Sequence, residues 1–173
     1  HMQVVPPEKV AAAPEEGKSR VVFMRPSGLG FAVQSSVFEV KGDTPSLVGI
    51  VAAKKKVSYQ LDPGEHLFMV IGESADFMSA ELEPNKTYYA LVTPRMGFWK
   101  ARFSFEPVHA GELTSLQFDE WYEDCEWVEK SSTSDIWASE NILSIQSKYE
   151  EDYKEWINKE ATERPKLLPQ DGK

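Results

Sequence analysis

The chain has 173 residues, 41% of them hydrophobic, and a formal net charge of −9 at pH 7. This length allows one domain of ordinary size with appendages. The acidic balance argues against nucleic-acid binding and against adsorption to anionic lipid, because both need a basic face. The single cysteine, Cys125, rules out an intrachain disulfide. No run of about 18 apolar residues occurs, so we predict no transmembrane helix.

The N-terminal segment, residues 1–19, is rich in proline, alanine and glutamate. His1-Met2 is interpreted as an expression-vector scar. Pro6, Pro7 and Pro14 block a continuous helix, and few side chains of the segment can be buried. We predict a flexible tether here, with a frayed terminus of no particular role as the alternative.

Residues 20–110 are predicted to form a β-domain, because short apolar runs alternate there with turn residues. Asp62-Pro63-Gly64 is a strong turn signal. About seven strands follow from the pattern, at residues 21–24, 31–40, 47–53, 54–61, 66–72, 87–92 and 99–106. Turn signals every 8 to 12 residues, with no helix between them, are typical of a sandwich or barrel.

The final predicted strand shows the clearest alternation. Trp99, Ala101, Phe103 and Phe105 point to one side, and the polar residues between them point to the other. Alternation of apolar and polar residues, with one face exposed to solvent, is typical of an antiparallel strand. The predicted fold is therefore mainly β, an antiparallel β-sandwich of about seven strands.

After the sandwich the sequence changes character. Residues 111–137 form an acidic, aromatic connector, for which helix and strand remain alternatives. Residues 138–164 are predicted to form an amphipathic α-helix that ends before Pro165, and residues 165–173 a loose tail. The helix has one apolar stripe at spacings of three and four, made of Ile142, Ile145, Tyr149, Tyr153 and Trp156.

Three motifs in order resemble the bacterial domain of unknown function 2846. They are Arg25-Pro26-Ser27, Leu61-Asp62-Pro63-Gly64-Glu65-His66 and Lys86-Thr87-Tyr88-Tyr89. The resemblance covers about residues 20–107, and the Pro-Gly-x-His turn is shared with PEGA-type envelope domains. It implies an immunoglobulin-like or prealbumin-like sandwich, a location in the periplasm or cell envelope, and a lipid anchor on the native N-terminus. It implies no activity.

The acidic cluster Asp119, Glu120, Glu123 and Asp124 is the most suggestive candidate for chemistry. On a helix its members would pair at i and i+4, which could hold Ca²⁺ or act as acid and base. No EF-hand pattern accompanies the cluster, so we favour a solvated acidic face.

Other polar residues are interpreted as structural. His66 and His109 lack metal-binding spacing, and His66 is expected to pack or to form hydrogen bonds beside its turn. Cys125 lies between two carboxylates, which should raise the pKa of its thiol and oppose nucleophilic use. Lys54-Lys55-Lys56 is interpreted as a solvated run or as edge protection.

The sequence therefore predicts a protein that is not an enzyme, with no catalytic residues, cofactor or metal. The expected activity is binding of another protein, or self-association, through the exposed part of the helix stripe or a sheet edge. The alternative is a carbohydrate-binding module that uses surface tryptophan and tyrosine. The chain has five tryptophans, which we expect to glue the helix to the sheet. A hydrolase using the carboxylates at 119–124 is the least favoured hypothesis.

Overall fold

The computed structural model describes residues 1–96 and 101–173, which are mainly β and form two sheets. Sheet A has the order β1-β10-β5-β2-β8-β9 and sheet B the order β11-β7-β6-β3-β4. The strands of sheet A are Met2–Val4, Glu126–Lys130, Lys55–Leu61, Ser19–Arg25, Thr87–Arg95 and Arg102–Pro107. Those of sheet B are Lys166–Leu167, Ala75–Leu82, Gly64–Ile71, Ser35–Lys41 and Thr44–Val51.

The two sheets enclose a common core, and each is covered again on its outer face. In β2, Val21 and Phe23 point into the core, where Phe23 meets Phe68 of sheet B at 5.0 Å between ring centroids. Val22 and Met24 alternate with them and belong to a second cluster on the outer face of sheet A. Strands covered on both faces are apolar throughout, which explains runs such as residues 21–24.

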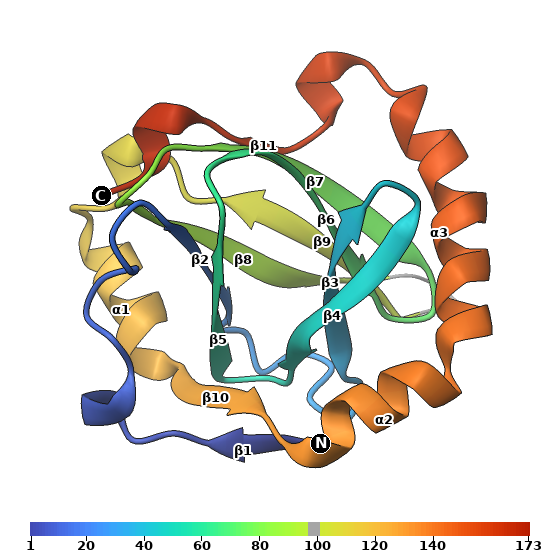
Figure 1. The fold of residues 1–173 in the computed structure, drawn as a ribbon, viewed down its shortest axis with the longest axis horizontal. Coiled ribbons are helices and arrows are strands. Elements are labelled where there is room, and N and C mark those ends of the chain that lie inside the picture. The colour runs from blue at the N-terminus through green and yellow to red at the C-terminus, as the bar shows by residue number, and fades with distance from the viewer. Residues whose placement is uncertain (97–100) are drawn as a thin grey trace.

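Different elements cover the two outer faces. Helix α1 (Leu116–Asp124) packs on sheet A, where Phe118 lies edge-on to Tyr89 at 4.9 Å between centroids. Helix α3 (Ile142–Ile157) packs on sheet B, following the short α2 (Ser132–Glu140). Figure 1 shows α1 and α3 at opposite sides of the sheets.

Each of the seven predicted strands has a counterpart in the structure. In β9, Phe103 and Phe105 are buried in the common core as expected, whereas Trp99 lies outside the described residues. Strand β7 was not predicted. Its sequence, ADFMSAEL, mixes small and polar residues, and both of its faces are packed, so period two is weak.

The pairing is not purely antiparallel, which corrects the expectation from sequence. Among the described strands, β2–β8, β10–β5 and β11–β7 are parallel. The chain between β2 and β8 runs through both sheets, so it supplies the long crossover that a parallel pair requires. Alternation within one strand cannot reveal which distant strand lies beside it.

Both chain ends are packed rather than loose. Met2–Val4 forms β1 against β10, Val5 is buried, and Arg20 donates to the carbonyls of Ala11 and Ala12. At the other end, Leu167 of β11 is fully buried in the common core. The tether and the loose tail predicted for these segments are therefore not what the structure shows.

The region after Pro107 contains three α-helices, β10 and β11. The acidic connector contains α1, β10 and the first part of α2, so both of the open alternatives, helix and strand, occur within it. The helix predicted over 138–164 is divided: α2 ends at Glu140, and α3 ends at Ile157, well before Pro165. Within the described residues, none of the helices combines the length and the apolar character that crossing a membrane requires.

Candidate functional site

The predicted partner contact turns out to be the inner face of α3. Ile145, Tyr149 and Trp156 are only 4%, 5% and 5% exposed, because they pack on Phe77 and its neighbours in sheet B. Tyr153 is half-buried beside them, and only Ile142 is exposed. Most of the stripe is thus packed on the chain's own sheet, and Tyr153 keeps part of its ring exposed.

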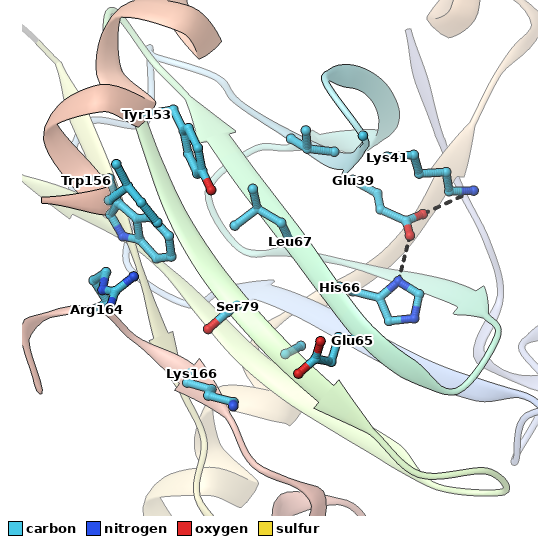
Figure 2. A pocket seen from close by; sticks show the side chains of 14 residues that line it. Glu39, Lys41, Glu65, His66, Leu67, Ser79, Tyr153, Trp156, Arg164 and Lys166 are labelled. Carbon is cyan, nitrogen blue, oxygen red and sulfur yellow. Dashed lines mark hydrogen bonds and ion pairs between the residues drawn. The ribbon is translucent and has the colours of Figure 1, made fainter. Parts of the chain in front are cut away.

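A groove remains beside the C-terminal half of α3 (Figure 2). This α3 groove has a volume of about 620 Å³. Its floor is the outer face of sheet B, its wall is α3, and Arg164 and Lys166 line the end where the chain passes from α3 to β11 beside β7. The lining residues used below are Leu67, Ser79, Tyr153, Trp156, Arg164 and Lys166.

The wall of the groove is a stack of aromatic rings that ends in a cation. Tyr149 and Tyr153 are 5.4 Å apart between centroids, and Tyr153 and Trp156 are 5.9 Å apart, each pair nearly parallel. The guanidinium carbon of Arg164 lies 5.3 Å from the Trp156 ring. Trp156 Nε1 and Arg164 Nε are buried and lack a hydrogen-bond partner among the described residues. Two donors therefore remain unsatisfied at the end of the wall.

Arg164 is also the groove cation without a carboxylate. Lys166 Nζ lies 3.3 Å from Glu81, and Lys41 Nζ lies 3.4 Å from Glu39. Within the described part of the chain, no carboxylate comes within ion-pair distance of Arg164. A guanidinium held by stacking presents its remaining N–H donors in a fixed plane, which suits a carboxylate.

His66 lies at the other end of the groove and is anchored by hydrogen bonds, as expected from its place beside the turn. Its Nδ1 is 2.8 Å from Glu39 Oε1, and its Nε2 is 2.7 Å from the carbonyl oxygen of Asp62. The hydroxyl of Tyr59, from sheet A, donates to Glu39 Oε2 at 2.5 Å. Since Glu39 and the Asp62 carbonyl are both acceptors, the ring satisfies both only as an imidazolium.

The electrostatics of this cluster are consistent with that charge state. The hydrogen bond to Glu39 raises the pKa of His66 above its usual value. Burial acts to raise the pKa of Glu39, but hydrogen bonds from His66 and Tyr59 outweigh it, so the pKa is lowered. Burial raises the pKa of Tyr59, and its bond to Glu39 adds to that effect. All three side chains are committed to each other, so none is a free base or nucleophile.

The other candidate site residues predicted from the sequence do not come together in one site. Asp119, Glu120, Glu123 and Asp124 are all exposed on α1, consistent with a solvated face. His109 binds Asp171 at 2.9 Å, far along the chain from His66. Cys125 is buried, and its thiol pKa is raised to about 11, chiefly by burial rather than by the neighbouring carboxylates.

The three lysines of the run at 54–56 lie in different environments, which the sequence did not predict. Lys54 pairs with Asp124 at 3.0 Å and Lys55 pairs with Glu126, both at the surface. Lys56 is only 4% exposed and points beneath α1. In β5 the inward positions are Val57, Tyr59 and Leu61, so Lys56 takes the outer face of sheet A. That face is covered only by segments remote in sequence.

The described tryptophans leave little surface for stacking a sugar. Trp127 and Trp156 are buried, and Trp121 and Trp137 are half-buried.

No known protein family matches this chain, and no curated protein matches it.

Proposed function

We propose that this protein is a non-catalytic binding domain whose α3 groove holds an extended segment of a partner protein. The segment has an aspartate or glutamate flanked by apolar residues. The observation that carries the proposal is Arg164, a stacked guanidinium without a carboxylate at the end of an aromatic wall. Its counter-charge would come from the partner.

The shape of the groove supports an extended occupant. The floor between Leu67 and Ser79 is a sheet face, and Tyr153 provides a half-buried ring above it. Apolar side chains of the segment would lie on Leu67 and Tyr153, while its carboxylate meets Arg164. The net charge of −9 keeps acidic chains away from most of the surface, which would favour selectivity for one local contact.

The neighbouring sheet edge is a weaker candidate, although sequence analysis allowed it. Along β7, the N–H of Ala75 donates to Asp152 Oδ2 at 2.7 Å, and the N–H of Phe77 to Asp76 Oδ1 at 2.9 Å. The N–H of Ser79 donates to the carbonyl of Pro165 at 3.1 Å. An added strand would have to displace these acceptors, so the edge is protected.

A binding role also fits the polar groups near the groove. His66 forms hydrogen bonds through both ring nitrogens, to Glu39 and to the carbonyl oxygen of Asp62, and Tyr59 donates to Glu39. Among the described lining residues, Trp156 and Arg164 offer buried donors without a protein partner. For the finer fold we propose the prealbumin-like form, because β2 lies between β5 and β8, which differs from the constant-type immunoglobulin order.

The location is proposed on the resemblance alone. We propose that the native protein lies in the periplasm or cell envelope, with a lipid anchor on its N-terminus. Fractionation of cells that express the native gene should place it with periplasmic or envelope markers. Recovery with a cytosolic marker would contradict this.

The binding proposal is tested with matched peptides. Fluorescently labelled peptides of about ten residues would carry one central glutamate between apolar residues, alongside copies with glutamine at that position. We expect Arg164→Met to weaken binding of the glutamate peptides by about 10- to 100-fold, since a charge-assisted hydrogen bond contributes about 1.5–3 kcal/mol. Fluorescence anisotropy gives the affinities.

Two controls keep the result specific. Lys154→Met removes an exposed cation from α3 that does not line the groove, and it should leave binding unchanged. The glutamine peptides should bind wild-type protein as weakly as the glutamate peptides bind Arg164→Met. Equal binding of the two peptides to wild-type protein would contradict the proposed role of Arg164.

A further inference from the structure

A second cavity lies on the outer face of sheet A, away from the α3 groove. Its volume is about 830 Å³. It is lined by the N-terminal strap, which we define as residues 4–12, and by the end of α1 with the start of β10. Tyr89 of β8 and Trp127 of β10 contribute aromatic surface. The strap contributes valine, proline and alanine, so much of the lining is apolar.

Lys56 is a buried cation in this cavity. Its Nζ donates to the carbonyl of Tyr122 and lies 3.8 Å from the centroid of the Tyr122 ring and 4.8 Å from that of Trp127. No carboxylate within the described ranges lies within 4.0 Å of this nitrogen. An ammonium group has three donors, and only one protein acceptor meets them here. Burial lowers the pKa of Lys56.

Arg20 is a second buried cation along the same cavity. It is 7% exposed, its Nε donates to Thr87 Oγ1 at 3.1 Å, and its terminal nitrogens donate to the strap carbonyls of Ala11 and Ala12. It too has no ion-pair partner among the residues that the structure describes. Arg20 therefore fixes the strap while adding positive charge to the cavity.

The acidic residues nearby do not neutralise these cations. Asp124 and Glu126 line the cavity but pair with Lys54 and Lys55 on the outside. Glu123 also lines it and is exposed, and its charge favours the protonated form of Lys56 without contacting it. Within the described residues, three buried cations, Arg20, Arg25 and Lys56, have no carboxylate partner, and Arg20 and Lys56 are the two that line this cavity.

We propose that this cavity binds a small organic anion, a carboxylate or sulfonate with an aromatic or apolar body. The anionic group would accept hydrogen bonds from Lys56, and the body would lie against Tyr89, Trp127 and the strap. Such a ligand satisfies the unpaired donors of the ammonium and fills the apolar lining. An inorganic anion would do only the first.

The test uses 8-anilinonaphthalene-1-sulfonate as the anionic probe and N-phenyl-1-naphthylamine as its uncharged counterpart. We expect the sulfonate to bind wild-type protein at one site and to be displaced by benzoate. Lys56→Met should weaken sulfonate binding about tenfold or more, the scale of losing a charge-assisted hydrogen bond, and change binding of the neutral probe far less. Lys154→Met removes an exposed lysine of α3 that does not line this cavity, and it should bind as wild type.

A second measurement does not depend on any variant. In ¹H–¹⁵N spectra of the wild-type protein, the anionic probe should shift the indole N–H signal of Trp127 and leave that of Trp156 in place. Unchanged sulfonate affinity in Lys56→Met, or a shift confined to Trp156, would overturn the proposal. Because Trp156 belongs to the α3 groove, the two sites succeed or fail independently.

Discussion

The two outer faces of the sheets are covered in different ways. Sheet B is covered by two consecutive helices: the aromatic side chains of α3 pack on Phe77 and Met69, and Trp137 of α2 packs beside them. Sheet A is covered by pieces: the N-terminal strap, α1, and the C-terminal end, where Lys173 Nζ lies 4.8 Å from the Phe118 ring. One cover is local in sequence, and the other is assembled from both chain ends.

The two covers also rely on different forces. The contacts of α3 are mainly apolar, so their stability scales with buried area. The cover of sheet A depends on polar anchors: Arg20 to the strap carbonyls, Lys56 to the Tyr122 carbonyl, and Asp171 to Ala110 and Leu168. The free-energy cost of removing such charged groups from water offsets much of the stability that their hydrogen bonds contribute. We therefore expect the cover of sheet A to be the more easily opened, which would give a ligand access to its cavity.

The largest effect should come from truncating the cover of sheet B. Trp156→Ala is expected to lower the free energy of unfolding by about 3–5 kcal/mol, because it leaves a cavity under α3. Ile142→Ala, an exposed position on the same helix, should change it by about 0.5 kcal/mol or less. Urea denaturation measures both. Equal effects of the two substitutions would mean that α3 is not packed as described.

A smaller effect is expected from the polar anchors of sheet A's cover. The buried Asp171 accepts from Ala110 N at 3.0 Å, Leu168 N at 2.8 Å and His109 Nδ1 at 2.9 Å. Asp171→Ala should lower the free energy of unfolding by about 1.5–3 kcal/mol and increase hydrogen exchange near Ala110 before the core opens. Gln170→Ala, at an exposed neighbour, is the control. Protection at Ala110 equal to wild type would contradict an anchoring role.

The smallest effect concerns His66, which belongs to neither cover because Glu39 and Tyr59 join the two sheets. Its pKa is raised in the folded state, so its contribution is complete below the unfolded value of about 6.5 and is lost as pH rises through the folded pKa. Wild-type protein should lose stability over that window relative to His66→Gln. The loss is limited, since a neutral ring keeps one of its two hydrogen bonds.

Denaturation series at several pH values measure that difference. A difference between wild type and His66→Gln that stays constant from pH 6 upward would show that folding does not raise the pKa of His66. The stability of the covers on both faces should change equally with pH, because the cluster of His66, Glu39 and Tyr59 lies between the sheets.

Much of the β-region could be predicted from the sequence. The Asp62-Pro63-Gly64 turn joins β5 to β6 as expected, with Gly64 at a φ of 117°, which favours glycine. Of the predicted apolar stripe, Ile145, Tyr149 and Trp156 are buried on α3, whereas Ile142 is exposed. The sequence left both the chain's own sheet and another protein as partners of the stripe, since periodicity identifies a face and not what covers it.

The candidate sites were largely invisible to sequence reasoning. Arg164 follows α3 in an unremarkable acidic stretch, and its stacking on Trp156 depends on how the chain turns after Ile157. Lys56 lay within a run interpreted as solvated. Only the alternation in β5 indicated the orientation of Lys56, because it places Lys56 and Val57 on different faces of the strand. The residues that cover Lys56 lie about 50 to 70 positions away along the chain, in both directions.

Local sequence patterns were enough to predict the mainly β character, the positions of seven strands, the main turn and most of the apolar face of the last long helix. These features depend on neighbours a few residues apart. The parallel pairing of β2 with β8, the packing of both chain ends, and the burial of Lys56 and Arg20 became visible only in the folded chain. Each of these depends on contacts between distant segments, whose free energy is set by which surfaces meet and not by the pattern within either one.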